Sequence, residues 1–143
     1  MTMLTLDHAR TIIATAFAKA AELGLKPLGV VVLDAGGHTR AFERQDGAST
    51  ARYKIAFGKA NGCIAMGFGA RELHRRVQNR PYFLGAVGTM VDGGILPVPG
   101  GVLIRDDAGE IVGAVGVTGD TSDNDETCAV AGIEAAGFTA DPG

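Results

Sequence analysis

The chain has 143 residues, 46% of them hydrophobic and 20% charged, and this composition predicts one soluble globular domain spanning residues 1–143. The formal net charge is −3 and no run of Lys or Arg is present, so the sequence predicts no nucleic-acid partner and no membrane partner. The 22 glycines have no fixed period, which favours tight turns over a collagen-like or disordered chain.

The cysteines and the N-terminal segment indicate a cytoplasmic protein. Cys63 and Cys128 are isolated and form no CxxC motif, so we expect two buried, reduced thiols. The opening residues MTMLTLDHAR lack a basic segment followed by an apolar block. No apolar stretch reaches the ~18 residues that cross a membrane.

The first half of the chain predicts a helix followed by a β-hairpin. Apolar residues recur at helical spacing over residues 5–23, with Thr5 as the expected N-cap and Gly24 as the stop. The β-branched run at 28–34 and the alternating run at 38–43 predict two antiparallel strands around an Ala-Gly-Gly turn.

The second half predicts more helices around a second hairpin. A helix capped by Ser49 or Thr50 is expected to run to about Met66, followed by shorter helices at 70–78 and 81–90. Residues 101–118 repeat the plan of the first hairpin.

We expect the last helix to span about 123–137 with Ser122 as its N-cap, and the tail from residue 138 to be frayed. Two hairpins each bury one face, so an antiparallel sheet with packed helices follows, which is an α+β fold.

The polar segment TGDTSDNDE, residues 118–126, follows a predicted buried strand and leads into a helix. Capping and dipole compensation explain one or two such residues, but almost all of these side chains are polar. A helix start offers free N–H groups, so the sequence also predicts ligand contact here. The candidate ligand-binding residues of this segment are Thr118, Thr121, Ser122, Asp125 and Glu126.

Two further features are candidates for binding. Pro99, Gly100 and Gly101 mark either a bent edge strand or a backbone surface against which a flat ligand lies. Arg52 and Lys59 are seven residues apart and share a helix face, which is either solvated or a cationic clamp for carboxylates or haem propionates.

The three histidines are His8, His38 and His74. None has a second His or Cys at metal-ligand spacing, so no zinc or other metal-ion site is predicted. A single histidine can ligate haem iron, although a lone histidine is more often structural or exposed.

Three stretches together resemble the GlcG/HbpS family, which includes the C-terminal domain of PduO-type proteins. They are VVVLDAGGHTRAFERQDGAS, KIAFGKANGCIAMGF and GGILPVPGGVLIRDDAGEIVGAVGVTGDTSDNDETCAVAGI. The resemblance implies a profilin-like fold, with an antiparallel sheet of about five strands and helices on both faces, assembled as a dimer or larger homo-oligomer.

The resemblance also implies a small-molecule ligand, because family members are linked to haem binding, corrinoid-related operons and small organic acid catabolism. Our first hypothesis is a binding protein that holds haem or another flat carboxylate-bearing molecule in a groove between sheet and helices. The alternative is a catabolic enzyme of the deaminase, hydratase or tautomerase type acting on a small unsaturated oxo or amino acid. Asp120 or Asp123 would then be the general acid/base, buried enough for a raised pKa. A structural or regulatory role without chemistry is the third hypothesis.

Overall fold

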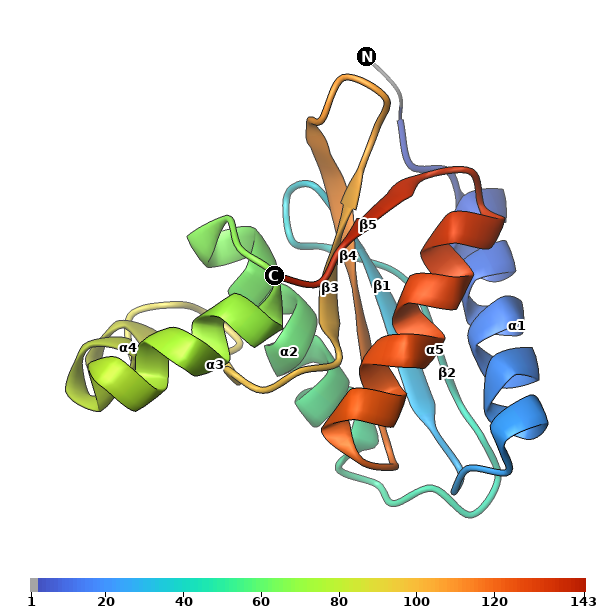
Figure 1. Ribbon diagram of the computed structural model, residues 1–143, viewed down its shortest axis with the longest axis horizontal. Coiled ribbons are helices and arrows are strands. Elements are labelled where there is room, and N and C mark those ends of the chain that lie inside the picture. The colour runs from blue at the N-terminus through green and yellow to red at the C-terminus, as the bar shows by residue number, and fades with distance from the viewer. Residues whose placement is uncertain (1–2) are drawn as a thin grey trace.

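The computed structural model describes residues 3–143, which form one antiparallel sheet between helices (Figure 1). The strands are β1 (Gly29–Asp34), β2 (Thr39–Arg44), β3 (Gly101–Arg105), β4 (Ile111–Thr118) and β5 (Thr139–Asp141), in the spatial order β2-β1-β4-β3-β5. The helices are α1 (Leu6–Leu23), α2 (Arg52–Met66), α3 (Ala70–Asn79), α4 (Pro81–Gly88) and α5 (Ser122–Ala135). The α+β fold, with five strands and helices on both faces, is confirmed.

The alternating side chains of β1 divide the core into two layers. Val30 and Val32 pack under α1, in the core layer that α5 completes over β3 and β4, whereas Val31 and Leu33 pack under α2 on the opposite face. Because both faces of β1 are covered, its apolar run is continuous rather than alternating.

The ends of α1 follow the sequence pattern. The Thr5 hydroxyl accepts a hydrogen bond from the His8 amide at 3.1 Å, and the Thr5 amide donates to His8 Nδ1 at 3.1 Å, which completes a capping box. Gly24 ends the helix in the left-handed region with φ of +67°.

The predicted caps of the other two long helices are wrong. α5 begins one residue early, so Thr121 and not Ser122 is the N-cap, and the Thr121 hydroxyl accepts from the Asn124 amide at 3.2 Å. At α2, Ala51 occupies the N-cap position without a side-chain hydrogen bond, so neither Ser49 nor Thr50 caps it. Tertiary packing against the sheet therefore holds the start of α2.

The C-terminal tail is ordered, which corrects the expectation of fraying. Residues Thr139–Asp141 form β5 and pair antiparallel with β3. Arg105 Nε donates to Asp141 Oδ2 at 2.9 Å, which fixes the new edge strand to its neighbour.

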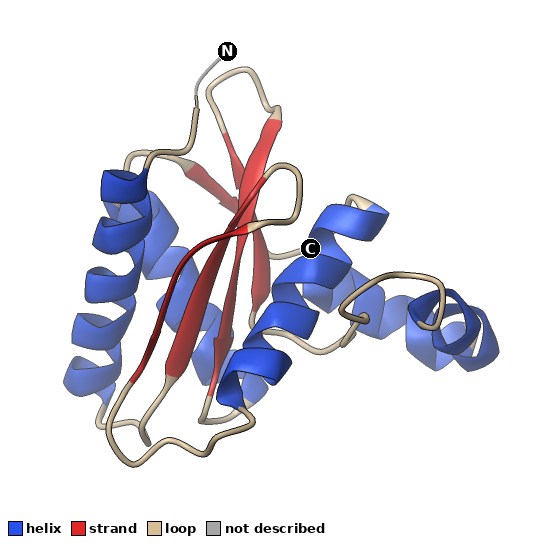
Figure 2. Ribbon diagram, turned by 180° about the vertical axis from the view of Figure 1, so that it is seen from behind, coloured by secondary structure: helices blue, strands red, loops and turns tan. Residues whose placement is uncertain are grey.

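Helices α3 and α4 project away from the sheet as an arm, residues 70–88 (Figure 2). Tyr82 and Phe83 of α4 are exposed, while Leu84 is buried against α3. None of the described helices is both long and apolar enough to span a bilayer.

Two register shifts lie at the same end of the sheet, where both hairpins turn. Between β1 and β2, Leu33 pairs with Thr39 and Val32 with Ala41, so Arg40 is an extra residue. Between β3 and β4, Arg105 pairs with Ile111 and Ile104 with Gly113, so Val112 is extra. Such bulges re-aim side chains and are common beside functional sites.

Candidate functional site

The polar segment at the end of β4 is built around a buried ion pair. Lys59 Nζ of α2 lies 3.1 Å from Asp125 Oδ2 of α5, and their side chains are 4% and 2% exposed. Lys59 Nζ also donates to the Val117 carbonyl at 2.9 Å, and Asp125 Oδ1 accepts from the Asp120 amide at 3.0 Å. The pair joins helices from opposite faces of the sheet.

Burial shifts both groups toward their neutral forms. Desolvation lowers the pKa of Lys59, while the charge of Asp125 raises it. Desolvation also raises the pKa of Asp125, and Lys59 opposes that change. The prediction that Lys59 lies on a solvated helix face is therefore wrong, because α2 packs closely against β4 and buries this side chain.

The glycines of the PGG loop explain how Lys59 can be buried. A Cβ on Gly100 would lie 2.7 Å from Lys59 Nζ, and one on Gly101 would lie 2.5 Å from the Lys59 carbonyl oxygen. Pro99, Gly100 and Gly101 are all buried. This geometry gives the loop a packing role under α2, rather than an open backbone surface for a flat ligand.

Arg52 lies on the same side of α2 as Lys59 and reaches the same strand end. Its Nη1 donates to the Thr118 hydroxyl at 2.7 Å, and Thr118 is buried. The Arg52 guanidinium thus already has a hydrogen-bond partner within the chain.

The carboxylates proposed for acid–base chemistry lack the expected burial. Asp120 Oδ2 accepts from the Thr121 amide and from Asn124 Nδ2, both at 2.8 Å, and Oδ1 accepts from the Lys26 amide at 3.1 Å. These hydrogen bonds lower the pKa of Asp120 to about 2, so the expected raised pKa is wrong. The Asp123 side chain is 80% exposed.

Arg71 of α3 completes this polar end by binding Asp123 and Glu126 of α5. Its Nε lies 2.9 Å from Glu126 Oε1, and Nη2 pairs with Asp123. The structure therefore brings the sequence-predicted residues together, but most of their polar atoms bind one another. That arrangement is typical of a structural network rather than an open site.

A groove at the opposite end of the sheet has a volume of about 630 Å³, and we call it the hairpin-tip groove. Both extra residues of the register shifts, Arg40 and Val112, line it. The other lining residues are Met3, Leu4, Asp34, Ala35, Gly36, His38, Glu110 and Ile111.

His38 is placed in this groove by the turn between β1 and β2. Asp34 Oδ1 accepts from the amides of Gly36 and His38, each at 3.0 Å, and lies 3.4 Å from His38 Nδ1. A carboxylate beside Nδ1 orients an imidazole and leaves Nε2 free to bind a metal. All three histidines were candidate haem ligands in the sequence, and no sequence pattern favoured His38 over His8 or His74.

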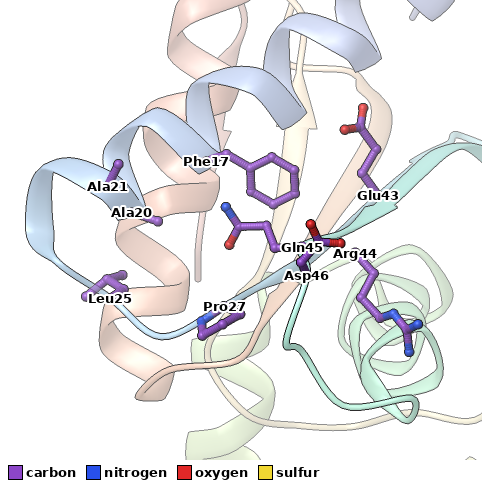
Figure 3. A pocket seen from close by; sticks show the side chains of 9 residues that line it. All are labelled: Phe17, Ala20, Ala21, Leu25, Pro27, Glu43, Arg44, Gln45 and Asp46. Atoms are coloured by element: carbon purple, nitrogen blue, oxygen red, sulfur yellow. The ribbon is translucent and has the colours of Figure 1, made fainter.

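A second groove of about 630 Å³ lies between α1 and the end of β2 (Figure 3). Figure 3 shows Phe17 and Gln45 on its inner side, with the Arg44 guanidinium pointing away from them. The Gln45 side-chain oxygen already has a partner in the chain, because Oε1 accepts a hydrogen bond from the Leu28 amide at 2.8 Å. Its lining holds no His, Met, Cys, Tyr or Lys that could ligate iron: Phe17, Ala20, Ala21, Leu25, Pro27, Glu43, Arg44, Gln45 and Asp46.

The cysteines are free and buried, as expected. Burial raises the pKa of the Cys63 thiol to about 12 and that of Cys128 to about 11, so both stay protonated at neutral pH. Across residues 3–143, no three His, Cys, Asp or Glu side chains converge as a metal-ion site.

Comparison with known proteins gives consistent matches over almost the whole chain. A 15.0 kDa protein of Citrobacter freundii encoded in the dhaT–dhaS intergenic region is 30% identical over 136 residues, which are 92% of this chain and 90% of the relative. A double-mutant form of HbpS from Streptomyces reticuli is 30% identical, with a TM-score of 0.80 over 94% of this chain and 87% of that one.

The structure of a PduOC–haem complex superposes with a TM-score of 0.83, covering 96% of this chain and 97% of that one. At 23% identity this likeness shows the fold alone. The family described as haem degrading protein HbpS-like matches residues 4–134, and the chain belongs to that family.

Proposed function

We propose that this protein binds haem, or another flat carboxylate-bearing molecule, in the hairpin-tip groove. The observation that carries the proposal is that both register shifts of the sheet place their extra residue, Arg40 and Val112, in the groove that also holds His38. Two independent irregularities that converge on one groove favour a binding site over chance.

The lining residues fit haem in three respects. The Nε2 atom of His38 would supply an iron ligand, since Asp34 lies beside the other ring nitrogen, Nδ1. Arg40 offers a guanidinium for a propionate, and Leu4 and Ile111 offer apolar surface for the macrocycle. A volume of about 630 Å³ lies within the ~300–1,000 Å³ usual for ligand pockets.

The relatives support the same ligand class. The family is named for haem degradation, and a protein of the same fold was solved as a haem complex. Bound haem would supply the iron and its redox chemistry, whereas this chain would hold the imidazole through Asp34 and bind the carboxylates through Arg40.

A haem titration followed by visible absorption tests the proposal on purified apo-protein. We expect a saturable Soret band at one haem per chain or per dimer, and an altered spectrum with at least tenfold weaker binding in His38→Ala. His74→Ala is the matched control, because His74 contacts the Pro97 carbonyl outside the groove and should not change binding. We also propose that the protein is a homo-oligomer. Light scattering on the same sample tests this by measuring the number of chains per particle.

Absence of saturable binding would overturn the proposal, and equal binding by His38→Ala would remove His38 as the ligand. The alternative of an acid–base enzyme required a carboxyl with raised pKa at Asp120 or Asp123. No geometric observation favours it, because Asp120 is a half-buried hydrogen-bond acceptor with a lowered pKa and the Asp123 side chain is exposed.

A further inference from the structure

We propose that the corner between α3 and α4 is a second binding site, which takes a small apolar monocarboxylate such as an aromatic acid. A cavity of about 200 Å³ lies there, far along the chain from the residues of the hairpin-tip groove. Its lining residues are Met66, Arg76, Asn79, Arg80, Phe83 and Leu84.

The inner wall of this arm cavity is apolar. Met66, Phe83 and Leu84 supply it, and Leu84 is only 5% exposed. An apolar cavity of about 150 Å³ is large enough to bind benzene, and this one has about 200 Å³. A six-membered ring therefore fits, whereas haem or a nucleotide does not.

The rim of the cavity carries uncompensated positive charge. Glu72 Oε2 pairs with Arg76 at 3.0 Å, but Glu72 Oε1 is shared with Arg75 at 2.8 Å, so one carboxylate serves two guanidiniums. Arg80 has no ion pair with any of residues 3–143. An anionic group on the ligand would supply the missing negative charge.

Aromatic rings hold both guanidiniums at the rim. Arg76 Cζ lies 4.0 Å from the ring centroid of Phe68, and Arg80 Cζ lies 5.4 Å from that of Phe83. An apolar interior with a few fixed polar groups at its mouth is the usual form of a small-ligand site.

The turn between the helices sets this geometry. The Arg80 amide donates to the Arg76 carbonyl at 2.8 Å and so ends α3, while Pro81 begins α4 with its fixed φ. The Phe83 amide donates to the Arg80 carbonyl at 3.3 Å, which keeps ring and guanidinium on the same turn.

Methyl NMR of protein labelled at its methionine methyl groups tests the proposal, because Met66 lines the arm cavity and Met3 lines the hairpin-tip groove. We expect sodium benzoate to shift the Met66 signal, assigned with Met66→Leu, in a saturable way and to leave Met3 unmoved. Benzamide, the uncharged analogue, should bind at least tenfold more weakly. The result is independent of haem, which would instead perturb Met3.

Arg80→Gln should weaken benzoate binding about tenfold, whereas Arg10→Gln, an exposed arginine on α1, should leave it unchanged. An unchanged far-UV circular dichroism spectrum and an unchanged thermal midpoint show that both variants are folded. No saturable Met66 shift, equal binding of benzamide, or full affinity in Arg80→Gln would each overturn the proposal.

Discussion

Asp120 shows how local hydrogen bonds can reverse an expectation based on residue type. An aspartate after a buried strand suggests a desolvated acid, but its two oxygens accept from the Lys26 amide between α1 and β1 and from two donors at the start of α5, the Thr121 amide and Asn124 Nδ2. The sequence predicts the crowding of polar residues here, but it does not show which backbone amides remain free to donate. The pKa direction follows from that geometry alone.

Asp120 should therefore contribute to acid sensitivity. Its folded-state pKa of about 2 lies below the ordinary 3.8, so its stabilisation is present above about pH 4 and is lost as the pH falls towards 2. We expect Asp120→Ala to flatten the decline of the free energy of unfolding in that window, measured by urea denaturation at several pH values. Asp107→Asn, in the exposed β3–β4 turn, should leave the decline as in the parent chain.

At the scale of elements, close approach between α2 and the sheet depends on glycine. A Cβ on Gly116 of β4 would lie 2.0 Å from the Ala56 carbonyl oxygen, and Gly100 faces Lys59 in the same way. No larger residue allows α2 to lie this near the strands.

We expect Gly100→Ala to destabilise the fold by about 3 kcal/mol or more, because a positive φ of 117° and a steric clash act together. Gly109→Ala is the matched control, since Gly109 has a φ of +81° but nothing within 4 Å, and should lose only about 1–2 kcal/mol. Thermal and urea unfolding measure both. Equal losses would show that the clash of the added Cβ with Lys59 Nζ and the Val117 carbonyl oxygen, each 2.7 Å away, contributes nothing.

Helices and hairpins are the part of the fold that sequence patterns predicted well, because periodicity and turn glycines are local. The start of α2 and the strand β5 were missed for the opposite reason. Ala51 has no side chain that could cap a helix, and Thr139–Asp141 becomes a strand only because β3 offers a free edge.

For the molecule as a whole, the Lys59–Asp125 ion pair connects α2 on one face of the sheet to α5 on the other face, at one end of the sheet. Removing one partner leaves a buried charge, which typically destabilises by about 3–5 kcal/mol. We expect that loss in Lys59→Met, measured by urea unfolding.

In the double variant Lys59→Met/Asp125→Asn, the asparagine still accepts from the Asp120 amide, and part of the lost stability should return. If the loss in the double variant equals the sum of the losses in Lys59→Met and Asp125→Asn measured separately, the two residues are not coupled.

The candidate site was only partly predictable at this scale. The sequence drew attention to the polar end of the sheet, where motifs are dense, whereas the hairpin-tip groove combines residues from the N-terminal segment and both hairpins. No spacing rule links Leu4, His38 and Val112, because register shifts and strand order bring them together.

The buried pair also has a consequence for how the chain is made. Asp125 follows Lys59 by 66 residues, so a growing polypeptide carries an unmatched ammonium in α2 until α5 has been synthesised. In any fragment that stops before α5, Lys59 must stay in water, and α2 cannot pack against the sheet. The buried position of α2 on the sheet therefore depends on a helix that is synthesised later.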